Sequence, residues 1–428
     1  SVLPLQTSRA FARARTGDAP RKLDFAAVAM GRIGTFIYRR RREVLLLGAI
    51  LIALAAWGAT KMYVNDARIL AFKSDHSIVR AADALNERFD GTSHLNIVLT
   101  PRRESETGLF LQPDVLRQVE QLEAYTETLD YVGGTHSLAG WVKRAHEKAN
   151  EGDPDYYAIP NDTEETKFYL DALSSDAPDD RLGMADLLGE IVDPTYTRTN
   201  LVVRMKSSQY IHQSPVIESL QAYLDEHFPK NGPLHAQLAG RANLDYHWVR
   251  IIRTSHIRSV CLAFVCVLLL TGLMFRSVVA GLLCTMTVGT AVAAIYAMMG
   301  FGHIPLGVGT SMFASIAIGA GVNFPIHIID RLRTRLSDPQ VDAEEVFRDT
   351  FTFTGRALLF TALVIAGGFL LLCVSEFRTL VRFGLLISAG MVVSFLTSVT
   401  LLPALLAVWR PRFLYRARAK RTAGKPDA

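Results

Sequence analysis

Six stretches of apolar residues divide the chain, and one long polar block, residues 65–256, separates the first stretch from the other five. A helix needs about 20 largely apolar residues to cross the hydrocarbon core of a bilayer. Each stretch meets this requirement, so the pattern predicts six transmembrane helices. These cover residues 44–64, 257–275, 277–301, 305–329, 355–375 and 380–408.

The polar block is rich in Asp, Glu, Lys and Arg and cannot enter lipid, which predicts a folded domain on one side of the membrane. Its periodicity predicts two units of the same order, strand–helix–strand, separated by an acidic insertion that is helical or irregular. Two such units indicate two ferredoxin-like subdomains in an α+β domain. The expected strands and helices are 95–100, 113–129 and 131–137 in the first unit, and 200–205, 215–227 and 234–239 in the second, with the insertion at 150–193 and a further helix at 76–89.

Basic residues fix the expected orientation. Arg39 to Arg42 directly precede the first span, and cytoplasmic loops carry the excess of Lys and Arg. Alternation then places residues 65–256 outside and the Arg-rich residues 331–335 and 410–421 inside, with Arg258 as an external exception. The sequence predicts a multi-pass protein of the bacterial inner (plasma) membrane with both termini in the cytoplasm. The expected parts are a cytoplasmic linker with an amphipathic segment at 1–43, the first span at 44–64, a periplasmic domain at 65–256, a five-helix bundle at 257–408 and a basic cytoplasmic tail at 409–428.

Bulk composition conceals this organisation. The chain has 428 residues, a formal net charge of +5 and a mean hydropathy of +0.20, because the polar block dilutes the helices. The basic balance does not indicate nucleic acid, since no basic patch with interleaved aromatic residues lies in the polar block. The first residue is Ser1, which favours a fragment or a processed chain, and we expect it to be the C-terminal half of a longer protein.

Enzyme chemistry has no recognisable motif. The sequence has no phosphate-binding loop of the Walker type and no Gly-x-Ser-x-Gly elbow, and its histidines do not show metal-ligand spacing. All four cysteines fall in apolar segments, which argues against a disulfide framework or a zinc site. We therefore expect a protein that is not an enzyme and that has no metal and no cofactor. The cysteines are Cys261, Cys266, Cys284 and Cys373.

Two of the apolar stretches resemble helices of a known family. Residues 307–311 and 319–327, followed by Asp330 and Arg331, resemble the tenth helix of resistance–nodulation–division (RND) exporters, and residues 401–406 resemble their last helix. The resemblance is to the MMPL-like branch, which exports lipids and is related to sterol-sensing domains. It implies a six-helix half with a porter-type outer domain. It also implies a homologous N-terminal half as partner, membrane lipids or another hydrophobic substrate, and a possible homo-oligomer.

The resemblance assigns a proton relay to this helix, where family members place a buried Asp that is often followed by Tyr. This chain has Asn323 and Phe324 at those positions. An amide cannot titrate, so the relay position is degenerate and the hypothesis is that this half is passive, with the titrating carboxylate in the other half. The alternative is that Asn323 simply forms a hydrogen bond between helices.

Several neighbours complete the candidate site. His327 lies one turn after Asn323 and is either a relay group or a structural residue, while Ser394 and Ser398 of the last span either accept hydrogen bonds from Asn323 or serve packing. Pro325 predicts a kink in the helix. Small residues predict close helix approach at Gly307, Gly309, Gly319 and Gly321.

Three functions remain open from the sequence. The first is half of an exporter that uses the proton-motive force to move lipids or other hydrophobic molecules out of the inner membrane. The second is a protein-export accessory of the Sec type, which also combines six helices with one outer domain. The third is a lipid sensor or scaffold that transports nothing, which loss of the relay carboxylate would permit.

Overall fold

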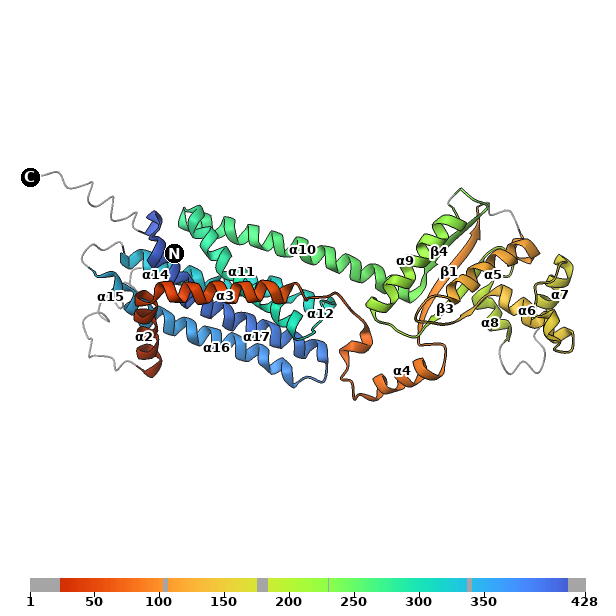
Figure 1. The fold of residues 1–428 in the computed structure, drawn as a ribbon, viewed down its shortest axis with the longest axis horizontal. Coiled ribbons are helices and arrows are strands. Elements are labelled where there is room, and N and C mark those ends of the chain that lie inside the picture. The colour runs from red at the N-terminus through yellow and green to blue at the C-terminus, as the bar shows by residue number, and fades with distance from the viewer. Residues whose placement is uncertain (1–23, 103–106, 175–183, 230, 337–340, 415–428) are drawn as a thin grey trace, which may run out of the picture.

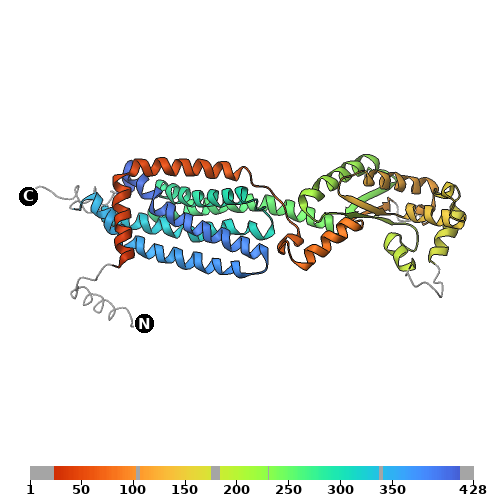
Figure 2. The same cartoon turned by 60° about the horizontal axis from the view of Figure 1, so that its bottom comes forward.

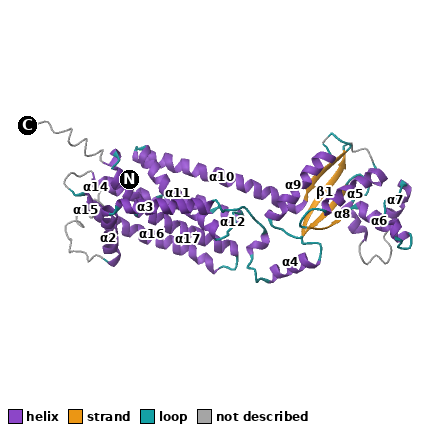
Figure 3. Cartoon of the chain, viewed as in Figure 1, coloured by secondary structure: helices purple, strands orange, loops and turns teal. Residues whose placement is uncertain are grey.

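The computed structural model describes residues 24–102, 107–174, 184–229, 231–336 and 341–414. The molecule is elongated, with a helical bundle at one end and an α+β domain at the other, and the long helix α10 (Gly240–Phe275) joins the two (Figure 1). Helices dominate both parts, and all strands lie in the outer domain (Figure 3). The architecture is therefore a polar domain attached to an apolar bundle, as the sequence pattern predicts.

Six helical segments are long and apolar enough to cross a membrane, which agrees with the six predicted stretches. Three are single helices: α3 (Arg41–Ala59), α10 and α11 (Val278–Phe301). The other three, Val308–Leu336, Ala343–Val374 and Arg378–Trp409, are composite. They consist of α12 (Val308–Ser311), α13 (Phe313–Gly321) and α14 (Asn323–Leu336); of α15 (Ala343–Thr350), the π-helical η4 (Phe351–Gly355), α16 (Arg356–Leu370) and η5 (Leu371–Val374); and of α17 (Arg378–Val399) and α18 (Leu401–Trp409).

The second span does not begin where hydropathy placed it. The sequence put the boundary between the outer domain and the bundle at residues 256 and 257, but α10 runs without interruption from Gly240 to Phe275. Polarity changes along this helix because its first half projects beyond the bundle, whereas the backbone hydrogen bonding continues unchanged. One rigid helix therefore connects the sheet to the membrane part.

The bundle has central and peripheral helices. The third, fourth and sixth segments are half buried or more, at 50%, 50% and 67% of their most apolar window, whereas the first, second and fifth are only 11–17% buried. The core between the central segments is formed by fully buried side chains such as Val288, Ile295 and Met391. The three peripheral helices leave apolar faces outward, as lipid contact requires.

Helix α2 (Phe25–Arg39) lies across one end of the bundle, beside the start of α3 (Figure 2). It matches the predicted amphipathic segment, with Met30 and Ile37 buried in the bundle core. Arg39 forms an ion pair of 2.8 Å with Glu344 at the start of the fifth segment. Its exposed Phe25 and Phe36 suit a helix that rests in the interfacial region of a membrane.

The outer domain has one sheet rather than two. Its strands are β1 (Ser93–Pro101), β2 (Val132–His136), β3 (Thr199–Met205) and β4 (Leu234–Ala239), in the order β2-β3-β1-β4 with every neighbouring pair antiparallel. With α5 (Pro113–Glu127) and α9 (Tyr210–His227), the chain follows one β-α-β-β-α-β unit. The prediction of two separate ferredoxin-like subdomains is therefore not confirmed, because β3 and β4 of the second unit pair with β1 of the first.

A single core holds this domain together. Leu95, Ile97 and Leu99 alternate along β1 and are fully buried on one face of the sheet, in one cluster with Leu122 of α5 and Leu220 of α9. The described residues of the insertion are largely helical. The remaining elements are η1 (Arg68–Ala71), α4 (Ser77–Arg88), η2 (Leu109–Leu111), α6 (Leu138–Ala149), η3 (Pro154–Tyr156), α7 (Thr163–Ser174) and α8 (Met184–Ile191).

The fourth segment is interrupted at Val322, three positions before Pro325, where the sequence predicted a kink. Helix α13 ends at Gly321 and α14 begins at Asn323. Pro325 has no amide hydrogen, and in a regular helix that hydrogen would bond to the carbonyl of Gly321. The hydroxyl of Ser394 in α17 donates to this same carbonyl, at 3.2 Å. A side chain from the sixth segment thus replaces the bond that the proline removes.

We expect Ser394→Ala to lower the free energy of unfolding by about 1 kcal/mol, because the buried Gly321 carbonyl loses its donor. In a Pro325→Ala background the same change should have little effect, since Ala supplies the missing N–H. Unfolding in mixed micelles, followed by circular dichroism, measures the four proteins of this cycle. Ser398→Ala is the control, because its hydroxyl donates to the Ser394 carbonyl within its own helix at 2.7 Å. If Ser394→Ala has the same effect in both backgrounds, the Ser394 hydroxyl does not replace the backbone hydrogen bond that Pro325 removes.

Candidate functional site

Asn323 and Phe324, which occupy the positions of the relay pair, lie on different faces of the fourth segment. Phe324 is fully buried and packs edge-on against Phe395 of α17, with ring centroids 5.9 Å apart. Asn323 is exposed on the outer face of the bundle, and His327 and Asp330 lie on the same exposed face of α14. Polar side chains on the outside of a membrane helix are unfavourable in lipid. This stripe therefore marks a surface that another helix or a water-filled space would cover.

Ser394 and Ser398 do not join Asn323. Both are fully buried, and their hydroxyls donate to the Gly321 and Ser394 carbonyls. The structure thus brings Asn323 and His327 together on one face and places the two serines on the opposite, inward side of the segment. Of the two roles that the sequence left open for the serines, the observed bonds are those of packing.

Three of the four predicted glycines stand where neighbours approach closely. A Cβ on Gly321 would lie 2.7 Å from the Ser394 hydroxyl oxygen, and one on Gly309 would collide with the Thr379 side chain. A Cβ on Gly307 would lie 3.0 Å from the Asn65 carbonyl oxygen. Gly319 has open space around it and is exposed. Close packing therefore explains the first three positions, and Gly319 extends the exposed stripe instead.

The sequence did not single out the junction between the bundle and the outer domain. Here Asn65 and Asp66 follow the first segment. Backbone bonds join Leu306 to Tyr63 at 2.9 Å and Asn65 to Leu306 at 3.2 Å, which attaches this strand-like linker to the start of the fourth segment. The Asp66 carboxylate accepts from the Val308 amide at 3.0 Å and so caps α12.

The same two residues hold the outer domain. The Asn65 side chain donates to Gln209 at 3.0 Å and accepts from the Ile211 amide at 3.3 Å, while the Asp66 carbonyl accepts from the Tyr210 amide at 3.1 Å. Asn65 is only 4% exposed. The junction thus fastens the end of the first segment, the start of the fourth and the start of α9 at one point. A displacement of α9 must therefore act on both segments.

A cavity of ≈ 450 Å³ opens beside this junction. Its apolar wall is formed by Leu244, Trp248 and Val249 of α10, and its polar groups include Arg68 and the paired side chains of Arg241 and Asp245. Thr379 and Gly309, which begin the sixth and fourth segments, form the floor. An apolar wall with a few polar groups is the usual composition of a site for a small amphipathic molecule.

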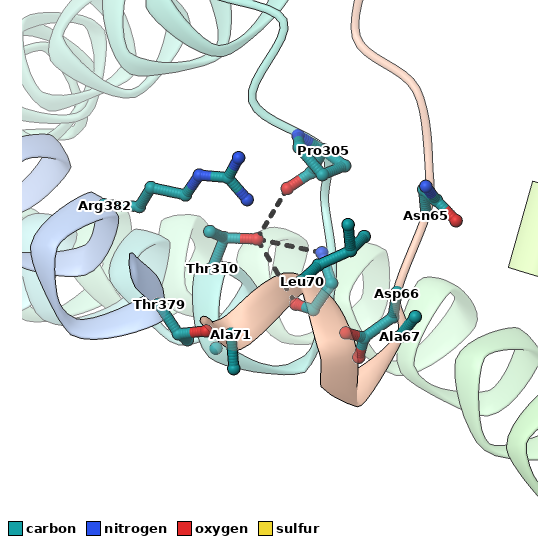
Figure 4. Close-up of a pocket in the computed structure, with 11 residues that line it drawn as sticks. Asn65, Asp66, Ala67, Leu70, Ala71, Pro305, Thr310, Thr379 and Arg382 are labelled. Atoms are coloured by element: carbon teal, nitrogen blue, oxygen red, sulfur yellow. Dashed lines mark hydrogen bonds between the residues drawn. The ribbon is translucent and has the colours of Figure 1, made fainter. Parts of the chain in front are cut away.

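A smaller recess adjoins the cavity, and the two share Asp66, Ala67, Ala71, Gly309 and Thr379. The Arg382 side chain points toward Thr310 and Pro305 in this recess (Figure 4). The Thr310 hydroxyl donates to the Pro305 carbonyl at 2.9 Å. Within the described residues no carboxylate forms an ion pair with Arg382, so a half-buried cation stands next to the amphipathic cavity.

On the other side of α10 lies a second cavity, of ≈ 620 Å³, between α9 and α10. It is more polar, and its lining includes Glu218, His247, Arg250 and Arg253. The first half of α10 is therefore flanked by cavities on both sides. The sequence does contain a sign of this region, because Arg and apolar residues alternate after Gly240. Averaging the hydropathy over a window conceals that alternation.

Comparison with known proteins agrees with this architecture. The model of the MMPL family matches residues 72–425, which include the outer domain and five of the six segments. Membrane protein MJ1562 of Methanocaldococcus jannaschii is 23% identical over 387 residues, and the alignment covers 88% of this chain and 93% of that protein. The family match extends over far more than half of the chain and agrees with the resemblance of its fourth and sixth segments to this family. The chain is a multi-pass membrane protein that belongs to the MMPL family.

Proposed function

We propose that this chain is a transporter unit that moves lipids or other amphipathic molecules outward from the inner membrane, driven by the proton-motive force. The proposal is supported by membership of the MMPL family and by the six segments that carry one outer domain. The observation that carries it is the cavity of ≈ 450 Å³ at the outer end of the bundle. Its position lets a molecule leave the outer part of the bilayer and enter the outer domain without crossing open water.

The chemistry of the cavity fits a molecule with an apolar and a polar end. Trp248 is 56% exposed and Leu244 is 54% exposed, so both present apolar surface toward a ligand. Arg68 in the cavity and Arg382 in the adjoining recess supply hydrogen-bond donors for a head group. The start of α9 contributes Tyr210 and Gln213 to the lining, and the junction at Asn65 and Asp66 couples α9 to the bundle.

The exposed stripe of the fourth segment supports a second, homologous six-span unit as partner. Asn323 and His327 lie on the outward face, where lipid would leave their polar groups without partners. In our proposal this face packs against the partner unit, supplied by a longer polypeptide or by a second copy. The alignment covers 93% of MJ1562, so that protein has the length of one six-span unit and not of two. This favours a second copy of the chain as the partner.

The proposed orientation follows the basic residues. Arg39 to Arg42 and Arg331 to Arg335 lie at the end of the bundle that carries α2, and positive residues concentrate on the cytoplasmic side. The outer domain is then extracytoplasmic, both termini are cytoplasmic, and the membrane is the inner membrane of a bacterium. The non-transporting sensor remains the second candidate, because Asn323 cannot titrate; a Sec-type accessory has no comparable support from the single-sheet outer domain.

We expect the native polypeptide, purified from membranes with an antibody against residues 409–428, to move NBD-labelled phospholipid to the outer leaflet of liposomes when the outside is more acidic. Dithionite quenching of the exposed label measures the rate. Trp248→Ala should reduce this rate about tenfold, since it removes the largest apolar contact of the cavity, worth roughly 1.4 kcal/mol. Trp409→Ala is the matched control, because Trp409 is equally exposed, at 56%, but lies at the other end of the bundle. A rate equal to that of empty liposomes would favour the sensor.

We expect Asn323→Cys, in a chain whose four cysteines are replaced by serine, to cross-link in native membranes to a homologous unit. Val364→Cys is the control, because that side chain is 73% exposed on α16 and faces lipid in the proposal. A product near twice 47.3 kDa identifies a second copy, whereas a native polypeptide of that mass without intermolecular product identifies a fused half. Equal cross-linking at both positions would show that the stripe is not an interface.

A further inference from the structure

Of the Asp, Glu, His, Lys and Arg side chains that the structure describes, only His256 is buried, at 7% exposed. It belongs to the stripe of α10 that faces the bundle, whose other buried members include Val249, Val260, Val267, Thr271 and Phe275. The stripe otherwise consists of side chains that do not ionise. An ionisable group on the interior face of a membrane bundle is costly and is a candidate functional group.

The imidazole joins three segments. Its Nε2 lies 2.8 Å from the Tyr296 hydroxyl oxygen of α11, and the Ser311 carbonyl at the end of α12 is an acceptor beside the same ring. Tyr296 and Phe313 of α13 pack around it, with ring centroids 6.0 and 6.1 Å from the imidazole. His256 is thus the point at which the second, third and fourth segments meet through polar atoms.

The two partners of the ring have different capacities. A backbone carbonyl only accepts, so it takes the single N–H of the neutral imidazole, and Nε2 then accepts from the Tyr296 hydroxyl. When a proton adds to Nε2, both ring nitrogens donate. The Tyr296 oxygen must then become the acceptor, and its hydroxyl hydrogen turns to another partner. No covalent bond other than the new N–H forms or breaks, and the ring gains one positive charge.

The facing helices α11, α12 and α13 contain no carboxylate that could neutralise that charge. The facing helix α11 has only Tyr296 and Cys284 as titratable side chains, and α12 and α13 have none. On α10 itself the neighbours are Arg253, Arg258 and Cys261. A charged His256 would therefore be a buried cation without a counter-ion, held by two neutral oxygen acceptors. Protonation must strain the packing among the three segments, and this is the requirement for a switch.

The site lies close to the outer surface. Tyr296 precedes the end of α11 at Phe301 by five residues, or about 7–8 Å along the helix axis. Arg253, one turn before His256 on α10, lines the cavity of ≈ 620 Å³ between α9 and α10. Water that enters this cavity would reach within about one helical turn of the imidazole, which gives protons from the outer side a short path to the ring.

We propose that His256 and Tyr296 form a proton-binding site whose occupation loosens the contact of α10 with α11 and with the start of the fourth segment. Because α10 also forms a wall of both outer cavities, a proton taken up here changes their shape. That the proton drives transport rests on the proposed function; that His256 binds a proton and responds with Tyr296 does not. Asn323 does not titrate, so this site gives the unit a proton-responsive group of its own.

The test is a titration of the full chain in lipid nanodiscs with ¹⁵N-labelled histidine. The His256 signal is assigned by its loss in His256→Gln, with His256→Asn as the second assignment variant should Gln prevent folding. We expect this signal to change from a neutral tautomer to the imidazolium as the pH is lowered from about 8 to about 4. Hydrogen exchange of the α11 peptide that contains Tyr296 should rise at least severalfold over the same range.

Tyr296→Phe provides the control for the pair. It should move the His256 midpoint by about one pH unit or more, because the hydrogen bond that the imidazolium donates to the Tyr296 oxygen is roughly twice as strong as the one that the neutral ring accepts, so the loss acts unequally on the two protonation states. The signal of His227, whose Nδ1 lies 3.1 Å from the Tyr223 carbonyl in the outer domain, should not move. A His256 signal that stays neutral throughout the range would overturn the proposal, as would a midpoint unaffected by Tyr296→Phe. Since neither readout involves transport, failure here leaves the lipid-transfer assay to decide the proposed function separately.

Discussion

Inside a bilayer every backbone polar group must find its partner within the protein, and this constraint shapes the bundle. Pro325 releases the Gly321 carbonyl, and Ser394 of the sixth segment takes over the bond. The exchange fixes the rotation of the fourth segment against the sixth, because the hydroxyl reaches the carbonyl from one side only. That rotation buries Phe324 and turns Asn323 and His327 outward.

The same requirement for hydrogen-bond partners explains how the bundle and the outer domain are joined. At the junction the chain leaves the helices, and its polar groups are satisfied by bonds between different elements: Asp66 caps α12, and Asn65 holds the start of α9. The rigid α10 provides the second connection between sheet and bundle. Movement of the outer domain is therefore transmitted through one hydrogen-bonded joint and one stiff helix.

Charge placement completes the functional picture. The fourth segment has an amide at the position where the family resemblance implies a carboxylate, while an imidazole occupies the buried stripe of α10. In our proposals the responsive group of this unit lies at the outer ends of the second, third and fourth segments, directly under the amphipathic cavity. A ligand and a proton would then act on the same helix contact, which is the physical basis of coupling between two sites.

Hydropathy determined the six segments, the polar domain, the amphipathic α2 and the strands and helices of the outer domain, because length, periodicity and a proline are local properties of the chain. The tertiary structure alone decided the partners. β1 pairs with β3 and β4, more than 90 residues away, so two predicted units became one sheet. His256 meets Tyr296 across 40 positions, and α10 crosses the boundary that polarity had drawn. The hydropathy pattern predicts which face of a helix or strand is buried. Only the tertiary structure shows which other element packs against that face.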